Sequence, residues 1–436
     1  MDRTLIKQLM TFLDNSPSCY HVVDNVKQEL LENGYEALRE CDPWDLQPGG
    51  KYFVVRGESA LIAFRIPRQV TGGFLMAAAH SDSPTFKLKQ EAELLGPGGT
   101  LRLSVEPYGG VINRSWLDRP LSVAGRVMVD VGGNVVSKHI YMNRDLLVIP
   151  SVAIHFDREV NKGKALNPAV DMLPLAGCAT QTGAFRKLIA EAAGVEEKDI
   201  LATDLFLTAR APATLLGMEE ELIAAPKLDD LECVFACMKG FLAAEECGTV
   251  PLLCIFDNEE VGSATRQGAD STLLADVVSH ISEALGRTPA QHQAAVAASF
   301  MVSADNAHAI HPAHPEYADK TEAPAMNGGI VIKQTASQRY TTDALSGAIF
   351  RMICRKAGVP VQAYSNRADL PGGSTLGNIS TSHLSVPAVD VGLAQLAMHA
   401  SYEVAGVKDL EYLVQAMTAY YGCDLRPSDE GATGIC

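Results

Sequence analysis

The sequence predicts an α/β protein in which a central mixed sheet, flanked by helices, is interrupted by a β-rich insert. Two changes of pattern along the 436 residues indicate this. Helix and strand patterns mix up to about residue 85, short alternating patterns dominate 86–211, and the mixed pattern returns over 212–436. At about 150 residues per domain, the length suits about three domains, or two with one large. The economical interpretation is one α/β domain made of residues 1–85 and 212–436, with 86–211 inserted.

The first part of this domain begins with helices and continues with strands. Apolar residues recur at helical spacing within residues 1–35, and Gly34 supplies a stop signal. Strand-like runs follow at 52–55, 61–66 and 74–79. These patterns predict two helices that precede three strands.

The insert has the alternation and the punctuation of a β structure. Apolar and polar residues alternate at 101–105, 121–129 and 139–141, and Gly-Gly and Pro separate such segments. We therefore expect a mostly β unit here.

The second part of the α/β domain follows Pro212. An apolar stripe over 231–242 predicts a helix, and the short apolar run 252–256 suits a buried parallel strand. Further strands are expected at 300–302, 330–332, 361–364 and 388–391, and further helices at 272–285, 343–356 and 410–421.

Charge and composition disfavour several classes of function. Lys and Arg number 36 against 52 Asp and Glu, and the net charge of −16 repels nucleic acid and anionic membranes. The longest aliphatic runs are far shorter than a membrane-spanning helix, and the first ten residues lack the apolar core of a signal peptide. The ten cysteines form no CxxC pair, and several lie in apolar stretches where a thiol packs as a small hydrophobe. We expect a cytoplasmic protein with reduced thiols and neither a nucleic-acid nor a membrane partner.

Acidic and imidazole side chains gather just past the carboxyl ends of three predicted strands. They are His80 with Asp82, the Asp-Asn-Glu-Glu run at 257–260, and Asp305 with His308. Ligands of open α/β sheets bind outside the carboxyl ends of strands, so one shared site is expected, with Asp229-Asp230 and His399 as further candidates. His and carboxylate are donors that zinc and manganese prefer, and adjacent acids can divide metal binding from proton transfer. The residues by themselves indicate a metal-assisted hydrolase.

Each cluster also has a purely structural interpretation. Adjacent acids usually form a solvated helix start, which we expect for 219–221, and a lone imidazole such as His399 is more often a core or surface residue. The Gly-rich run 371–374 lacks the lysine and spacing of a phosphate loop, and no GxGxxG lies between a strand and a helix. The concentration of metal-ligand types in three places favours function.

Seven strings together resemble the aspartyl aminopeptidase family of dinuclear zinc metallopeptidases. They are AAAHSDSPTFKLK (77–89), APKLDDL (225–231), FDNEEVGSAT (256–265), SADNAHAIHP (303–312), VIKQTASQRY (331–340), NRADLPGGSTLG (366–377) and MHASYEVAG (398–406). Any one string would be a weak match, but the set occurs in the family's order. The resemblance implies a metallopeptidase domain whose central mixed sheet is flanked by helices, and a β-rich dimerisation domain at 86–211.

Carried over residue by residue, the resemblance implies two Zn²⁺ ions per subunit. His80 and Asp305 hold one ion, Glu260 and His399 hold the other, and Asp229 bridges them. Each ion then has three protein ligands, the number typical of catalytic zinc. Mn or Co would suit the same donors.

The resemblance also implies how the chemistry is divided. Glu259 is the implied general base, which takes a proton from the activated water and later returns it to the leaving amine. Asp82 is placed to orient the imidazole of His80. A cis peptide bond is implied between Asp229 and Asp230.

The implied substrate is a peptide with a free N-terminal amine. Lys333 and Tyr340 match positions that line a pocket for an N-terminal Asp or Glu, although some members of the family prefer neutral residues. His308 matches a histidine that contacts the substrate. His155, in VAIHFDR (152–158), matches a segment that reaches a neighbouring subunit's active site, and the family assembles as dodecamers built from dimers.

Two further hypotheses remain open at this stage. One is another co-catalytic metallohydrolase, either a neutral-residue aminopeptidase or an N-acyl-amino-acid deacylase, since these share the HxD motif, the bridging Asp and the Glu pair. The other is a catalytically silent, self-assembling shell protein, which would have no need of Glu259.

Overall fold

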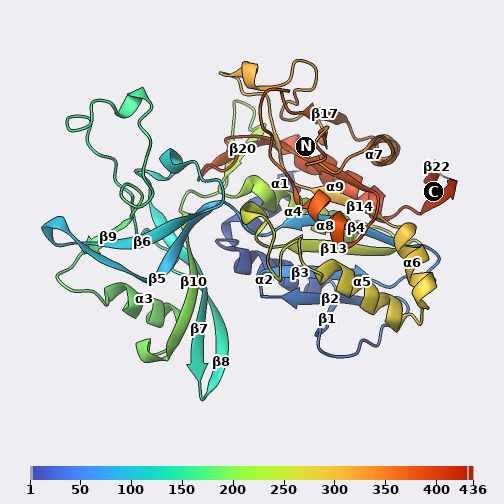
Figure 1. Cartoon of the computed structure of the whole chain (residues 1–436), viewed down its shortest axis with the longest axis horizontal. Helices are drawn as coiled ribbons and strands as arrows, with labels where there is room; N and C mark the ends of the chain where they lie inside the picture. The colour runs from blue at the N-terminus through green and yellow to red at the C-terminus, as the bar shows by residue number, and fades with distance from the viewer. Residues whose placement is uncertain (1–2, 430–431, 436) are drawn as a thin grey trace.

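A nine-stranded mixed sheet forms the centre of the larger part of the molecule (Figure 1). The computed structural model describes residues 3–429 and 432–435. The strand order is β1-β2-β3-β13-β4-β14-β18-β16-β17. The bounds are β1 (Glu36–Ala37), β2 (Lys51–Arg56), β3 (Ala60–Arg65), β4 (Phe74–His80), β13 (Val250–Phe256), β14 (Phe300–Ala304), β16 (Ile330–Gln334), β17 (Val361–Ser365) and β18 (Ala388–Gly392).

Strand β4 lies at the middle of this sheet, parallel to β13 on one side and to β14 on the other. All seven residues of β4 are buried, because both faces of the sheet are covered. Its side chains alternate as the period of a strand requires: Leu75 and Ala77 join one apolar cluster, and Phe74 and Met76 join the other. The expectation of a buried parallel strand at 252–256 is confirmed by β13.

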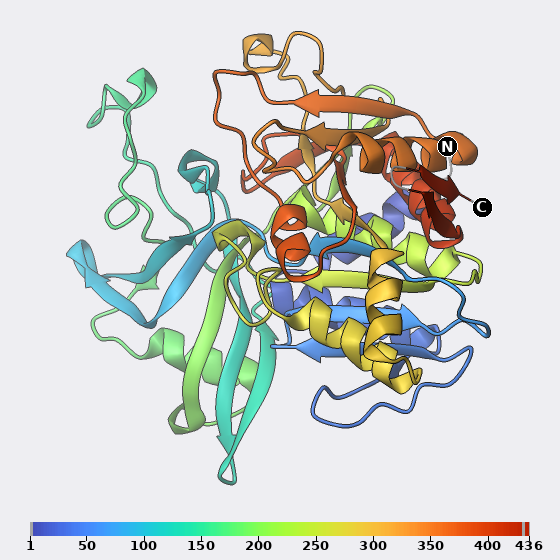
Figure 2. The same cartoon turned by 45° about the vertical axis from the view of Figure 1, so that its right-hand side comes forward.

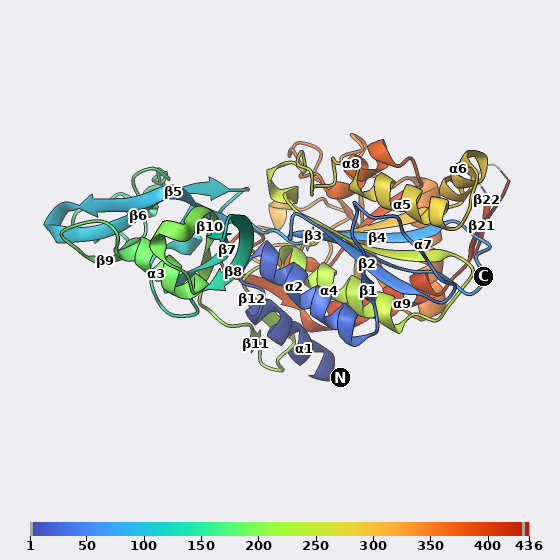
Figure 3. The same ribbon diagram turned by 90° about the horizontal axis from the view of Figure 1, so that it is seen from below.

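Helices cover the two faces of the sheet, as Figure 3 shows from below. One face carries α1 (Arg3–Asp14), α2 (Cys19–Glu32), α4 (Leu228–Ala243), α7 (Ala344–Ala357) and α9 (Val407–Tyr421). The other carries α5 (Leu273–Ala284), α6 (Pro289–Ala297) and α8 (Leu376–His383). The mixed α/β fold predicted from the sequence is therefore confirmed.

A second, six-stranded antiparallel sheet projects from this part at the left of Figure 1. Its order is β8-β7-β10-β5-β6-β9, and it has an apolar cluster of its own around Phe86, Trp116 and Leu205. The bounds are β5 (Thr85–Gly96), β6 (Thr100–Tyr108), β7 (Leu121–Val131), β8 (Asn134–Tyr141), β9 (Leu175–Cys178) and β10 (Ile200–Ala209). A helix that the alternating pattern did not predict, α3 (Ala184–Ala193), packs beside it.

A third, five-stranded sheet was also not predicted. It runs in the order β11-β12-β20-β19-β15, with bounds β11 (Thr214–Leu216), β12 (Leu222–Ala225), β15 (Ala307–His308), β19 (Ala394–Leu396) and β20 (Glu403–Gly406). Its strands have two to four residues, too few to display a periodicity in the sequence. A hairpin of β21 (Leu425–Asp429) and β22 (Ala432–Ile435) ends the described chain.

An ionic cluster fixes the six-stranded sheet against the central part. The Glu58 carboxylate, in the turn between β2 and β3, accepts hydrogen bonds from Arg126 Nη1 (3.2 Å) and Ser137 Oγ (2.6 Å). His139 Nδ1 lies 2.5 Å from Asp24 Oδ2 on α2. Burial alone would lower the pKa of His139, but the two carboxylates outweigh it and raise that pKa to about 9. His139 is therefore protonated at neutral pH and links α2 to β8.

Cys233, Cys237, Cys254 and Cys354 are buried free thiols, as expected. Over the described ranges, none of the helices has the length and apolar character needed to cross a membrane.

Candidate active site

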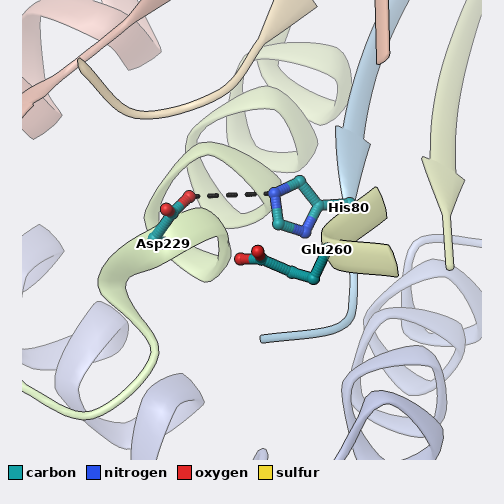
Figure 4. Close-up of side chains that lie close together, drawn as sticks. All are labelled: His80, Asp229 and Glu260. Carbon is teal, nitrogen blue, oxygen red and sulfur yellow. Dashed lines mark ion pairs between the residues drawn. The ribbon is translucent and has the colours of Figure 1, made fainter. Parts of the chain in front are cut away.

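The three clusters at predicted strand ends lie together in the structure. His80 is the last residue of β4, Glu259 and Glu260 follow β13, and Asp305 follows β14. Because β13, β4 and β14 are adjacent and parallel, their carboxyl ends place these side chains at one edge of the sheet. Ligand atoms of His80, Asp229 and Glu260 all lie within 4.8 Å of one another (Figure 4), as do those of His80, Glu259 and Asp305.

Asp229 reaches this edge from a sharp turn between β12 and α4. Lys227 has a left-handed φ of 61°, and the Asp229–Asp230 peptide bond is cis, as the resemblance implied. The backbone N–H of Asp229 donates to Glu403 Oε2 (3.0 Å), and its carbonyl accepts from Ser83 Oγ (2.9 Å). The turn is thus held on both sides.

The two carboxylate oxygens of Asp229 face two different histidines. Oδ1 lies 3.7 Å from His80 Nε2, and Oδ2 lies 3.4 Å from His399 Nε2. Glu260 Oε2 is also 3.5 Å from His399 Nε2. Asp229 therefore stands between one imidazole beside Asp305 and another beside Glu260.

Buried carboxylate oxygens in this group lack a donor. Asp229 Oδ1 and Glu260 Oε1 have no hydrogen-bond partner within the part of the chain that the structure describes. An unsatisfied buried polar atom costs about 1–3 kcal/mol, and more when it is charged. A divalent cation would satisfy both oxygens, and the donor set of imidazoles and carboxylates is one that zinc accepts. The residues present therefore fit a metal centre.

Asp82 organises the residues around it. Its carboxylate accepts the backbone N–H groups of Glu259 (3.1 Å) and Glu260 (3.2 Å) and the hydroxyl of Tyr108 (2.8 Å). Its carbonyl lies 3.1 Å from His80 Nδ1, which leaves Nε2 of His80 to face Asp229. Asp82 thus fixes both the imidazole and the Glu-Glu turn, as outer partners of metal ligands do.

Glu259 lies between the carboxylates of this edge. Burial chiefly, with the charges of Asp305, Asp82 and Asp229, raises its pKa to about 8, and His80 acts in the opposite direction. A raised pKa of this kind is typical of a carboxyl group that accepts and releases a proton near neutral pH.

Sequence reasoning gave no role to Glu403. This buried carboxylate accepts the N–H groups of both Asp229 (3.0 Å) and His399 (2.6 Å), so it joins two segments of the site. Burial chiefly raises its pKa to about 8. The signal was present, because Glu403 lies in the same MHASYEVAG string as His399. Tyr108, from β6, had no comparable signal.

Lys333 lies beneath the same edge, with its ammonium fully engaged. Its Nζ donates to the carbonyl (2.7 Å) and the carboxylate (3.1 Å) of Asp305 and to the carbonyl of Asn306 (3.2 Å). It also lies 5.3 Å from the centre of the Tyr340 ring. Burial alone would lower the pKa of Lys333, but Asp305 and its neighbours raise it, so the ammonium stays charged.

His308 lies on the surface, at the edge of a neighbouring cavity. The cavity has a volume of about 370 Å³, and His308, Tyr364 and Gly373 are among its lining residues. Lys333 and Tyr340 do not line it; both are buried. A substrate side chain in this cavity would contact His308 directly.

His155 is the one predicted site residue that the structure leaves apart from the others. It is exposed in the long loop between β8 and β9, which extends away from the central sheet at the upper left of Figure 2. Its neighbours Ile154 and Phe156 are 48% and 87% exposed. Within the described residues, His155 contacts no other predicted site residue.

Histidines and carboxylates at the carboxyl ends of parallel strands, with buried oxygens that have no donor among the described residues, are the arrangement of a metal-dependent hydrolase. The model of the family described as "Aminopeptidase I zinc metalloprotease (M18)" matches residues 12–421. The chain belongs to this family. It is a metalloaminopeptidase, an enzyme that hydrolyses peptide bonds.

Relatives and solved structures agree with this assignment. The probable M18 family aminopeptidase 2 of Clostridium novyi (strain NT) is 39% identical over 423 residues, which cover 95% of this chain and 98% of that protein. That of Clostridium acetobutylicum is 40% identical over the same length and coverage. The cryo-EM structure of the Ape4 and Nbr1 complex matches with a TM-score of 0.93 and 33% identity, over 96% of this chain and 86% of that one. The S. cerevisiae mApe1 dodecamer matches with a TM-score of 0.85 and 27% identity, over 96% of each chain.

Proposed function

We propose that this aminopeptidase works with two zinc ions per subunit. His80 and Asp305 would hold one ion, Glu260 and His399 the other, and Asp229 would bridge them. One observation carries the proposal: the two oxygens of Asp229 face the two imidazoles separately, at 3.7 and 3.4 Å. When bound, zinc lowers the pKa of water and polarises the carbonyl group under attack.

The protein's own groups would then handle the proton. Glu259, whose backbone N–H is held by Asp82, is placed to accept the proton of the attacking water and to return it to the leaving amine. Asp82 would keep His80 in one tautomer through its carbonyl at Nδ1.

We propose that the preferred N-terminal residue is acidic. The buried ammonium of Lys333, which lies next to Asp305 and 5.3 Å from the centre of the Tyr340 ring, supplies positive charge beside the site, in surroundings where charges are little screened. The test is kcat/KM on peptides that differ only in the first residue, each with a free and an acetylated amine. A preference for free Asp or Glu supports the proposal. A preference for Leu or Ala identifies a neutral-residue aminopeptidase, and cleavage of the acetylated series identifies a deacylase.

Lys333→Met should lower kcat/KM for an N-terminal Asp or Glu by about 10–150-fold, because it removes a buried positive charge beside the site, and an interaction with a charged group is typically worth about 1.5–3 kcal/mol. Hydrolysis of an N-terminal Leu should fall far less. Since Lys333 also contacts Asp305, zinc content must be measured in parallel. Lys239→Met, which removes a lysine paired with Glu29 on α2, is a matched control. Equal losses on acidic and neutral substrates would mean that Lys333 supports the structure instead.

We further propose that residues 86–211 form a dimerisation domain between the catalytic segments 1–85 and 212–436, and that the chain assembles in the cytoplasm as a dodecamer built from dimers. Support comes from the dodecameric mApe1 relative and from the exposed Ile154 and Phe156 on the loop that carries His155. Apolar side chains this exposed commonly mark a protein interface. In such an assembly, His155 would complete the active site of a neighbouring subunit.

Mixed oligomers of two inactive variants should regain activity. Glu259→Gln lacks the base and His155→Ala lacks the contact made in trans, so a mixed interface contains one site with an intact Glu259 and an intact partner's His155. The measurement is activity after subunit exchange, with each variant exchanged against itself as the control. Verified mixed oligomers without activity, or full activity of His155→Ala alone, would contradict the contact in trans.

A further inference from the structure

A second cavity lies behind the metal site, between the central part and the six-stranded sheet. Its volume is about 390 Å³, within the range of small-molecule sites. One wall of the cavity is aromatic and is formed by Trp116, by Tyr20 of α2 and by Phe206 of β10. Lys227, which directly precedes α4, also lines the cavity. Asp82 and Asp229 of the metal site line it, whereas Glu259, Glu260, Asp305 and His308 do not, so the cavity borders the metal site without including the general base.

Apart from Oδ1 of Asp229, which a divalent cation would satisfy, one charged group of this cavity lacks a partner within the described residues. Asp204 accepts from both Lys87 and Arg126, each at 2.8 Å. The Asp82 and Glu403 carboxylates receive the donors described above. The half-buried ammonium of Lys227 has neither a hydrogen bond nor an ion pair to any of residues 3–429 and 432–435. The ammonium of Lys227 is therefore available to pair with an anionic ligand.

Lys227 also lies where this cavity meets a third one. That third cavity has a volume of about 310 Å³. The residues that it shares with the cavity of about 390 Å³ are Pro17, Thr208, Ala209, Pro226 and Lys227. Asp14 lines it too, and Asp14 and Glu403 are the carboxylates whose charges act on Lys227. Asp14 Oδ1 accepts the N–H of Ala213 (2.9 Å). A cation and an anion thus lie at the junction, and an aromatic wall lies on one side of it.

We propose that this junction binds a free α-amino acid, the class of molecule that the peptidase releases. The carboxylate of the amino acid pairs with Nζ of Lys227, its ammonium faces Asp14, and its side chain packs against Tyr20 and Phe206. Because Glu259, Asp305 and His308 lie outside this cavity, the bound amino acid inhibits the enzyme without taking the place of the peptide.

The binding experiment uses the zinc-loaded enzyme with its active site saturated by an amino-acid hydroxamate. Titration with L-leucine in a calorimeter should reveal one remaining site per chain. Lys227→Met should weaken this binding by at least about 10-fold, the lower end for a lost charge-assisted contact. Lys227→Arg should retain it, and Lys187→Met, which changes an exposed lysine of α3, should leave it unchanged.

Kinetics supply a second readout. In the unmodified enzyme, L-leucine should lower the apparent kcat as well as raise the apparent KM, and in Lys227→Met only the effect on KM should remain. Absence of binding to the blocked enzyme, or equal binding by Lys227→Met, would overturn the proposal. Acetate binding as tightly as L-leucine would also overturn it, because acetate has no ammonium. None of these outcomes contradicts the two-zinc proposal, because binding of the hydroxamate tests the metal site separately.

Discussion

Glu259→Gln should lower kcat by about 10²–10⁴-fold while zinc content stays near that of the unmodified enzyme, because a positioned general base typically contributes this much. Glutamine preserves the size of the side chain and its hydrogen bonding, but its amide cannot take the proton of the attacking water. The backbone of residue 259 stays in place, since its N–H donates to Asp82 whatever the side chain is. The measurements are steady-state kinetics and zinc per subunit.

The neighbouring residue provides a matched control. Glu260→Gln makes the same chemical change one position further along the same turn, and its backbone N–H also donates to Asp82. There, however, the carboxylate has an unpartnered buried oxygen and faces His399. We therefore expect Glu260→Gln to lose zinc together with activity. Zinc loss in Glu259→Gln with retention in Glu260→Gln would show that the two roles are reversed.

Asp229→Asn should remove metal from both positions at once. The amide leaves one oxygen where the structure has two, and these two face different imidazoles. Even the loss of an outer partner of a metal ligand typically costs about 10–100-fold in metal affinity, and the loss of a shared ligand should cost more. The measurement is zinc retained after dialysis against a weak chelator, together with kcat/KM.

Asp257→Asn is a control for this experiment. Asp257 follows the same strand as Glu259 and Glu260, is as buried as Asp229, and within the described residues forms no hydrogen bond or ion pair with either histidine. The Asp257→Asn variant should therefore retain its zinc. Retention of two ions by Asp229→Asn would exclude a bridging role for Asp229.

The middle of the central sheet could be predicted from the sequence because its inner strands are buried on both faces. Runs such as 74–79 and 252–256 are continuously apolar, and no solvent-facing residue interrupts them. The small third sheet could not be predicted, since two-residue strands such as β15 are defined by their partners and not by a pattern of their own. Helix α8 could not be predicted for another reason. It begins just after the Gly-rich run 371–374, and that run by itself indicates only a turn.

The candidate site could likewise be predicted only in part from the sequence. Residues at the ends of predicted strands, such as His80 and Asp305, could be brought together from topology alone. The hydrogen bonds that orient them could not, because Tyr108 and Glu403 lie far from these residues in the chain and join them only after folding. The resemblance identified Lys333 as a site residue, but the sequence could not indicate that its three donors are all engaged by Asp305 and Asn306.

The position of β4 between β13 and β14 has a consequence for synthesis on the ribosome. β4 ends at residue 80 and β13 begins at residue 250, so β4 leaves the ribosome roughly 170 residues, or about 10–30 s, before its first parallel neighbour exists. The six strands of the second sheet, all within residues 85–209, emerge during that interval and have only one another to pair with. His399 and Glu403 appear later still. With the proposed set of ligands, a chain truncated before residue 399 lacks one ligand of the second zinc ion, so almost the whole length must be translated before the metal centre is complete.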